Sequence, residues 1–339
     1  MTFSWAVVGP GGIAHRFAEA VRGIEGAQIL AVCGRDVERA LQFASHCPAP
    51  KGIKPRATAR IADILNDPDI DGIYIATPHA HHLDPIERCL IAGKPVLCEK
   101  PLVVNTAQAK TIINLAQSRQ VFLMEAFWTR FLPIYDVVGE WLEHGAIGRV
   151  RHIQSSFCFQ MPFDPLHRLF NPSLAGGSLL DVGVYNLAMT RWALEKALQQ
   201  KCPEPLEIVA RAAHAPSGVD IRVVSTLVFP DDVTAQFVCG FDTQSEGALY
   251  IYGDKGTITI PSRFWEGQEA TLTRQRFSPI NERRPFRING FEYEIEAAMQ
   301  AITSGLNECS AMSLDDSCTV IGWMDIIRHK IGVSYPFEN

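Results

Sequence analysis

The sequence predicts a protein of two domains: an N-terminal α/β domain with a parallel, doubly wound sheet, and a C-terminal α+β domain with an open, mostly antiparallel sheet. Three observations indicate this fold class. The chain has 339 residues, more than one domain usually holds. Its first 125 residues alternate short apolar runs with helical patterns, whereas beyond residue 200 several strand-like runs follow one another without helices. We therefore expect domains at residues 1–125 and 126–339, with the terminal helix free to pack back on the first domain.

The first domain is expected to contain buried parallel strands, because Val, Ile and Leu dominate short runs that turn residues bound. These runs are Trp5–Val8, Gln28–Cys33, Gly72–Ala76, Pro95–Cys98 and Val121–Ala126. The helical patterns between them are Ile13–Arg22, Val37–Ser45, His82–Ala92 and Thr106–Ser118. Asn105 is a candidate N-cap for the last helix, with Gln108 completing a capping box. Such alternation gives a parallel sheet with right-handed crossovers.

The second domain has a different order of elements. Helices are expected near Tyr135–Glu143, Val182–Gln199, Glu292–Ser304 and Asp315–Ile331. A strand is expected from Val150, followed by strands at Glu207–Ala213, Val223–Phe229, Thr234–Phe241, Ala248–Tyr252 and Gly256–Ile260. Strands in direct succession favour antiparallel pairing.

Composition narrows the function classes. The formal net charge is −6 and no Lys/Arg block stands out, so we expect neither nucleic acid nor a membrane surface as a partner. No apolar stretch approaches the ~20 residues that span a bilayer, and the N-terminus lacks the features of a signal peptide. The nine cysteines are odd in number and form no C-x-x-C pair. Reduced core thiols in a cytoplasmic protein are therefore expected.

The first motif that carries chemistry is Gly9-x-Gly11-x-x-Ala14, which follows a predicted strand and opens a predicted helix. Gly9 permits a tight turn, Gly11 lets the backbone approach a pyrophosphate, and Ala14 keeps helix and strand close. The helix N-terminus, with Gly12 and Ile13 in its first turn, would stabilise the phosphate charge. The motif predicts a Rossmann dinucleotide site; a glycine-rich turn without a ligand is the alternative.

Cofactor choice is indicated at the end of the second strand, where NAD-binding folds usually place an acid. This chain has Gly34 and Arg35 there, and Asp36 follows one residue late. A guanidinium holds a 2′-phosphate in a bidentate manner, which favours NADP, with NAD still possible. The alternative is that Arg35 is a solvated turn residue and Asp36 caps the next helix.

Glu99-Lys100-Pro101 follows the strand Pro95–Cys98. In an open parallel sheet the carboxyl ends of strands line the ligand crevice, so Lys100 is expected to face the cofactor, with Glu99 beside it. Pro101 disfavours helix at Lys100. A surface lysine in a turn is the alternative.

Thr77-Pro78-His79-Ala80-His81-His82 also follows a strand. Thr77, Pro78, His79 and His82 are therefore expected near the nicotinamide or its ribose. No further His, Cys or Asp set at ligand spacing supports a metal site, and none is expected.

Gly176 and Gly177 precede a predicted helix that carries Asp181 and Tyr185. Residues four apart share one face of a helix, and a carboxylate beside a phenol suits proton transfer or hydroxyl binding. The alternative is a charge at the helix N-terminus with Tyr185 in the core.

Taken in order and spacing, these motifs resemble the glucose–fructose oxidoreductase / inositol dehydrogenase / MocA (Gfo/Idh/MocA) family over nearly the whole chain. The stretch 124–131, Met-Glu-Ala-Phe-Trp-Thr-Arg-Phe, and the stretch 332–336, Gly-Val-Ser-Tyr-Pro, resemble the dimeric dihydrodiol dehydrogenase / NADP-dependent D-xylose dehydrogenase branch. The resemblance implies that Lys100 is catalytic and that Asp181 and Tyr185 complete the site. Other branches carry His in place of Tyr185, which argues against inositol dehydrogenase activity. Trp128 and Phe157 resemble positions that line the substrate pocket, with core packing as the alternative.

Together these features predict an NADP-dependent dehydrogenase or reductase that acts on a CH–OH or C=O group of a small carbohydrate or polyol. Lys100 would carry the proton or stabilise the oxyanion, Tyr185 would share the proton path, and Asp181 would orient a substrate hydroxyl. The alternatives are a trans-dihydrodiol dehydrogenase or dicarbonyl reductase and, from another class, a catalytically inactive NADP-binding sensor. An open sheet face predicts a homodimer, or a dimer of dimers, built on the C-terminal sheet.

Overall fold

A computed structural model describes residues 2–47 and 54–338 and divides the chain into two compact units. The first comprises residues 1–128 and 287–318, and the second comprises residues 129–286 and 319–339. The segment 287–318 is thus grouped with the N-terminal residues by its contacts. Whether residues 1–125 and 126–339 fold as separate domains stays a prediction.

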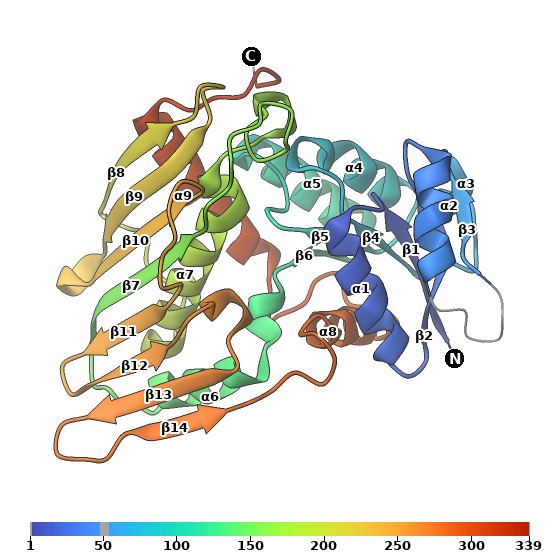
Figure 1. The fold of residues 1–339 in the computed structure, drawn as a ribbon. Helices are drawn as coiled ribbons and strands as arrows, with labels where there is room; N and C mark the ends of the chain where they lie inside the picture. The colour runs from blue at the N-terminus through green and yellow to red at the C-terminus, as the bar shows by residue number, and fades with distance from the viewer. Residues whose placement is uncertain (1, 48–53, 339) are drawn as a thin grey trace. The chain divides into compact units, whose positions relative to one another are not determined.

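The first unit is a Rossmann fold, as predicted (Figure 1). Its sheet of six parallel strands has the order β3-β2-β1-β4-β5-β6. The strands are β1 Phe3–Val8, β2 Ala27–Cys33, β3 Arg56–Thr58, β4 Gly72–Ile75, β5 Val96–Glu99 and β6 Leu123–Ala126. Because the order reverses between β1 and β4, the carboxyl ends of these two strands flank the crevice where such sheets bind ligands.

The first unit has six α-helices among its described residues, and four of them pack in pairs (Figure 1). They are α1 Gly12–Gly23, α2 Val37–His46, α3 Ala62–Leu65, α4 Leu83–Ile91, α5 Thr106–Arg119 and α8 Glu292–Thr303. Helix α4 packs against α5, and α1 packs against α8, which arrives from far along the chain. Asn105 caps α5 as predicted, since its Oδ1 accepts from the Gln108 N–H at 2.9 Å. Gln108 Oε1 in turn accepts from the Val104 N–H at 3.2 Å.

The second unit contains a sheet of eight strands in the order β14-β13-β12-β11-β7-β10-β9-β8. Neighbours are antiparallel except β7 and β10, which confirms a mostly antiparallel sheet. The strands are β7 Val150–Cys158, β8 Glu207–His214, β9 Asp220–Val228, β10 Thr234–Gly240, β11 Leu249–Gly253, β12 Gly256–Ile260, β13 Glu269–Arg274 and β14 Ile280–Arg283.

One face of this sheet is covered and the other is open (Figure 1). Helix α7, Val184–Leu198, packs on β7 and β10, and α6, Pro133–Glu143, packs on α7. The last helix, α9 Leu314–Ile331, crosses the division between the two units. On the central strands, buried residues that face the helices alternate with more exposed residues on the open face. None of the described helices is long and apolar enough to cross a membrane.

One expected helix differs in its first turn. The sequence predicted a single α-helix over Val182–Gln199, but residues Leu179–Gly183 form a π-helical turn before α7 begins at Val184. Every residue of this turn is buried, so hydrophobic periodicity carries no signal for its wider winding. Asp181 therefore lies on the π-helical turn and Tyr185 on the α-helix, not on one regular helical face as expected.

Candidate active site

The glycine turn of the first unit fits a dinucleotide phosphate. Gly9 has φ +91°, and a Cβ there would lie 2.8 Å from the Ala76 carbonyl, so only glycine lets the loop after β1 approach the loop after β4. Gly11 is the N-cap of α1, and no side chain caps this helix end or places an acid in its first turn. Its N–H groups and the positive end of the helix dipole therefore suit an anion. Ala14 is fully buried, as helix–strand packing requires.

Gly34, Arg35 and Asp36 follow β2, and the last of them caps the next helix. Asp36 is the N-cap of α2, where its Oδ1 accepts from the N–H groups of Glu38 at 2.9 Å and Arg39 at 3.3 Å. Gly34 donates its N–H to the Thr58 carbonyl at 3.1 Å. Arg35 lies between them with an exposed side chain. Asp36 thus serves the helix, while Arg35 presents a guanidinium at the carboxyl edge of the sheet.

Lys100 follows β5, and buried groups hold the backbone on both sides of it. Its side chain is half-buried. Before it, Glu99 accepts from the Tyr74 hydroxyl at 2.6 Å. After it, the N–H of Leu102 donates to Glu125 Oε1 at 3.0 Å. The peptide between Lys100 and Pro101 is cis. Lys100 is therefore a half-buried lysine at the carboxyl ends of the parallel strands, between residues that buried hydrogen bonds hold in place.

His82 has a different environment from the one its motif predicts. Its ring is fully buried, and its nitrogens lie 2.8 Å from the Thr77 carbonyl oxygen and 3.0 Å from the Pro101 carbonyl oxygen. Burial lowers the pKa of this imidazole, and the nearby Lys100 charge acts in the same direction, while its hydrogen bonds to backbone carbonyls oppose the shift. His82 thus links the loop after β4 to the Lys100 turn. His79 is also largely buried, whereas Thr77 and Pro78 are half-exposed.

Trp128, expected near the substrate, packs inside the first unit. Its ring centroid lies 5.0 Å from that of Phe291, and the Arg16 guanidinium lies 4.6 Å from its centroid. Only 4% of Trp128 is exposed. These contacts give the indole a packing role and a cation–π partner.

In the second unit, Asp181 pairs with a residue that the sequence did not indicate. Asp181 is 5% exposed, and its Oδ1 lies 2.7 Å from Arg168 Nη1. Arg168 belongs to the irregular loop after β7, where no periodicity or motif draws attention to a single arginine. Its side chain is 49% exposed, so one ionic group of the pair is buried and the other reaches solvent.

Asp220, another unpredicted residue, holds the turn that carries Asp181. This fully buried carboxylate accepts from the Ser178 hydroxyl at 2.9 Å and the Leu179 N–H at 2.7 Å. Burial raises its pKa to about 6, although these hydrogen bonds act in the opposite direction. Gly177, with φ +119°, passes so close that a Cβ would overlap Asp220 Oδ1. The π-helical turn is therefore fixed at its first residues.

Tyr185 lies at one end of a cluster of aromatic rings. Its ring lies 5.5 Å from Phe157, and Phe157 stacks on Trp265 at 3.4 Å with an interplanar angle of 6°. Tyr185 and Phe157 are 7% and 9% exposed, so the cluster is largely buried. Asn186, beside Tyr185, donates to the Ser155 hydroxyl in the core and does not extend this cluster. Flat, weakly polar faces and a phenol thus lie together in the second unit.

The described residues contain no group of three or more His, Cys, Asp or Glu side chains placed to hold a metal ion. Of the residues predicted for the site, the structure groups the glycine turn, Arg35 and Lys100 in the first unit, and Phe157, Asp181 and Tyr185 in the second.

Two family models match consecutive parts of the chain. A model of an oxidoreductase family with an NAD-binding Rossmann fold matches residues 3–127, and the GFO/IDH/MocA C-terminal domain matches residues 135–259. The chain is 32% identical to trans-1,2-dihydrobenzene-1,2-diol dehydrogenase of Xenopus tropicalis, covering 99% of this chain and 100% of that protein. It is 30% identical to the Homo sapiens protein of that name, covering 99% of each.

Among solved structures, a 3-ketoreductase from Actinomadura kijaniata in complex with NADP and TDP-benzene has a TM-score of 0.85. Its identity to this chain is 25%, and 98% of each chain is covered. The chain therefore belongs to the Gfo/Idh/MocA family of oxidoreductases, with a Rossmann domain that binds NAD or NADP.

Proposed function

We propose that this oxidoreductase uses NADP and transfers a hydride to or from a carbon that bears a hydroxyl or carbonyl in a small carbohydrate or polyol. The observation that carries the proposal is the fixed turn at Lys100, which presents an ammonium group at the ligand edge of the Rossmann sheet. When bound, the dinucleotide supplies or accepts the hydride. The protein has to bind the reacting group, exclude other orientations and move one proton.

Roles follow from the chemistry of each side chain. The Lys100 ammonium donates a proton to the oxygen of a carbonyl undergoing reduction, and the amine accepts it back during oxidation. The Tyr185 phenol binds the same oxygen and shares the proton. Asp181, oriented by Arg168, accepts a hydrogen bond from a neighbouring substrate hydroxyl. Gly9, Gly11, Gly12 and the first turn of α1 hold the pyrophosphate.

A second candidate, oxidation of a trans-dihydrodiol, is favoured by the aromatic cluster. Phe157, Trp265 and Tyr185 offer stacked and tilted faces that suit a flat carbocycle as well as the C–H face of a sugar. Relatives at 32% identity bear the name of that activity. Carbohydrates and trans-dihydrodiols share a pair of adjacent hydroxyls, so one carbon can react while Asp181 binds its neighbour.

Absorbance of NADPH at a fixed enzyme concentration separates these candidates. We expect oxidation or formation of NADPH with aldoses or ketoses and little with simple monoalcohols. Turnover of trans-1,2-dihydrobenzene-1,2-diol or dicarbonyls with every sugar inert would instead support the second candidate. Lys100→Met keeps the apolar stem and removes the ammonium, so kcat should fall by about 10²–10⁴. NADPH affinity should change little. A wild-type protein that binds NADPH but is inert with the whole panel would support the non-catalytic sensor instead.

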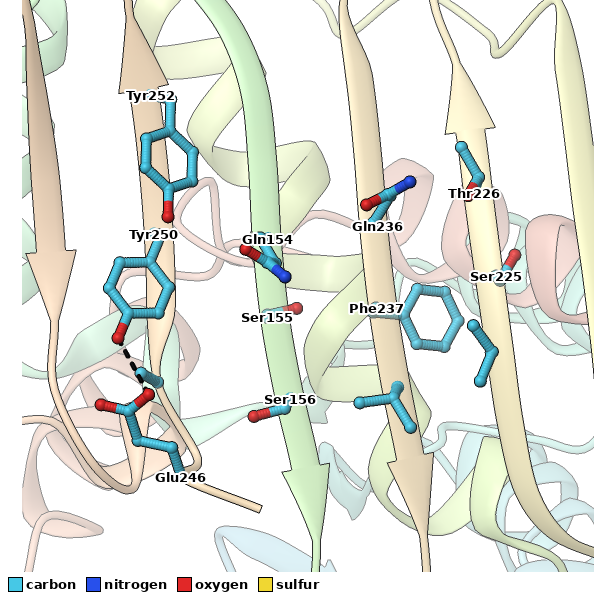
Figure 2. A pocket seen from close by; sticks show the side chains of 13 residues that line it. Gln154, Ser155, Ser156, Ser225, Thr226, Gln236, Phe237, Glu246, Tyr250 and Tyr252 are labelled. Atoms are coloured by element: carbon cyan, nitrogen blue, oxygen red, sulfur yellow. Dashed lines mark hydrogen bonds between the residues drawn. The ribbon is translucent and has the colours of Figure 1, made fainter.

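We also propose a homodimer, or a dimer of dimers, in which the open face of the C-terminal sheet is buried. Figure 2 shows this face as a shallow depression across β9, β10, β7 and β11, lined among others by Thr226, Gln236, Gln154 and Tyr250. Val224 is 52% exposed there and Val209, on β8, is 45% exposed. The face mixes amides, hydroxyls and aromatic rings with these valines, and is less apolar than the sequence led us to expect.

The location proposed for the protein is the cytoplasm. All nine cysteines are free thiols, and eight of them are buried. Unpaired thiols persist where glutathione and thioredoxin keep proteins reduced. Counting thiols after the protein has been isolated without added reductant and unfolded should give nine per chain, and a lower count would indicate disulfide pairing.

A further inference from the structure

The segment that follows α9 folds back on itself through an ion pair. Arg328, near the end of α9, contacts Glu338 twice, with Nη1–Oε2 at 2.8 Å and Nη2–Oε1 at 2.9 Å. Glu338 Oε2 also accepts from the Tyr335 N–H at 2.9 Å. The Arg328 side chain is only 7% exposed, so this pair is shielded from water. Residues 332–338 therefore form a closed loop rather than a loose tail.

Tyr335 extends from this loop into the interior of the second unit. It is 1% exposed, its ring lies 5.0 Å from the Arg328 guanidinium, and its hydroxyl donates to the Gly176 carbonyl at 2.7 Å. Burial raises the pKa of this phenol well above its usual value, so the hydroxyl stays protonated and able to donate. A fully buried phenol aimed at one backbone carbonyl fixes the position of that carbonyl.

Gly176 lies in the tight turn that leads to Asp181. A Cβ at Gly176 would lie 2.7 Å from the Leu169 carbonyl oxygen, so the turn passes directly against the preceding loop. The Gly177 N–H donates to that same oxygen at 2.9 Å, and the Asp181 N–H donates to the Gly177 carbonyl at 3.3 Å. Displacement of the Gly176 peptide is thus transmitted to Asp181 within one helical turn.

The loop 168–177 also carries the ionic partner of Asp181. Arg168 begins it and pairs with the Asp181 carboxylate at 2.7 Å. The Gly176 N–H donates to the Asn171 carbonyl at 3.0 Å, which closes the loop on itself. The hydrogen bond from Tyr335 to Gly176 therefore restrains the Asp181 carboxylate through the backbone. It restrains the Arg168 guanidinium through the loop 168–177.

We propose that residues 332–338 are a latch, in which Tyr335 acts through Gly176 as a positioning residue that aims Asp181 at the substrate. The proposal rests on the role proposed above for Asp181. Glu338 and Arg328 hold the latch closed. Asp220 anchors the same turn from β9, so the carboxylate is oriented from two sides.

The test begins with Tyr335→Phe, which removes only the hydroxyl that reaches Gly176. The assays use NADP with trans-1,2-dihydrobenzene-1,2-diol and NADPH with D-xylose. We expect kcat/KM for the responding substrate to fall about tenfold, while the Kd for NADPH, measured by fluorescence, stays within twofold. Ser225→Ala is the matched control, because it also removes a buried hydroxyl that donates to a backbone carbonyl, that of Val209 at 2.9 Å. It should leave kcat/KM unchanged.

A double-variant cycle distinguishes positioning from general loosening. If Tyr335 acts through Asp181, then Tyr335→Phe combined with Asp181→Asn should be no worse than Asp181→Asn alone. Additive losses, or wild-type kcat/KM in Tyr335→Phe, would overturn the latch. Amide exchange supplies a readout without substrate: residues 177–183 should exchange faster in Tyr335→Phe and not in Ser225→Ala.

The latch and the proposed function fail in different ways. An Asp181→Asn enzyme with normal kcat/KM would remove Asp181 from the substrate site, whatever Tyr335→Phe does. A large loss in Asp181→Asn together with none in Tyr335→Phe would reject the latch alone. Should Tyr335→Phe not fold, Glu338→Gln keeps the side-chain size and weakens the closing ion pair. Glu338→Gln should also lower kcat/KM, and an unchanged kcat/KM would reject the latch.

Discussion

At the scale of single residues, Arg35 is the side chain that we expect to set the preference for NADP. Arg35 is exposed beside Gly34, while Asp36 is occupied at the start of α2. We expect Arg35→Ala to raise the Kd for NADPH about tenfold or more, because a charge-assisted hydrogen bond is worth about 1.5–3 kcal/mol. The Kd for NADH should stay almost constant. Arg22→Ala, at the opposite end of α1, is the control for loss of one exposed charge. Equal losses for both cofactors would exclude a 2′-phosphate contact at Arg35.

Glu294 on α8 is a buried acid that the proposed mechanism does not use. It is fully buried, and neither carboxylate oxygen has a hydrogen-bond partner among the described residues. Burial raises its pKa well above the usual value, and the charge of Glu99 adds to this shift. Since the pKa of Glu294 is raised in the folded state, this carboxyl destabilises the protein least at a pH below its own pKa in the unfolded chain. Stability is then lost as the pH rises from that value toward the folded-state pKa.

We therefore expect Glu294→Gln to raise the free energy of unfolding at pH 8 and to change it less at pH 5. The amide has the same shape and carries no charge at either pH. Urea denaturation at both pH values measures the difference. Glu296→Gln, on the same helix but half-exposed and paired with Arg287, should show no such gain. A Glu294→Gln protein that is less stable at pH 8 than the wild type would show that the carboxylate has a stabilising partner.

At the scale of elements, the π-helical turn Leu179–Gly183 depends on one side chain. Asp220 accepts two hydrogen bonds at its start, so Asp220→Ala leaves the Leu179 N–H and the Ser178 hydroxyl without that acceptor. Each unsatisfied buried group costs about 1–3 kcal/mol. Asp220→Asn keeps an acceptor and removes the charge, so it should lose less stability than Asp220→Ala. Urea denaturation at pH 7 compares the two, and equal losses would contradict the capping role.

The pH dependence of this element has a defined sign. The folded-state pKa of Asp220 is raised to about 6, above its usual value of 3.8. Stability from this group is therefore complete below about pH 4 and declines as the pH rises through about 6. Asp220→Asn should be free of that decline. A wild-type and an Asp220→Asn protein with parallel pH profiles between 4 and 7 would exclude Asp220 as its cause.

Sequence patterns predicted the elements whose burial is periodic or continuous. The strands β1, β4 and β5 were found because all of their residues are buried, and β2 because most of its residues are, so apolar residues dominate all four. The short strand β3, the edge strand β14 and its neighbour β13 were missed, because polar residues dominate their sequences. The glycine and lysine motifs were recognisable because each follows a strand. Asp220 and Arg168 were not recognisable, because only the fold of the chain brings these two residues to the turn that carries Asp181.

At the scale of the whole molecule, the open sheet face is the surface on which we expect two chains to meet. Val224 lies on β9 and lines the depression, and it is 52% exposed. In a twofold dimer the same patch of each subunit forms the interface. A charge introduced there would be buried in the dimer, and the partner subunit would bury the same charge. Val224→Arg should therefore convert the dimer to a monomer.

Light scattering at micromolar concentration measures this directly, against a chain mass of 37.5 kDa. The wild type should have twice that mass, or four times for a dimer of dimers, and Val224→Arg should have half the mass of the wild type. Ile91→Arg, on α4 of the first unit with a side chain 57% exposed, adds the same charge elsewhere and should leave the assembly intact. A wild-type monomer would exclude the dimer. An assembled Val224→Arg protein would instead place the interface on another surface, because a buried arginine pair without partners costs more than mixed polar contacts of this face return.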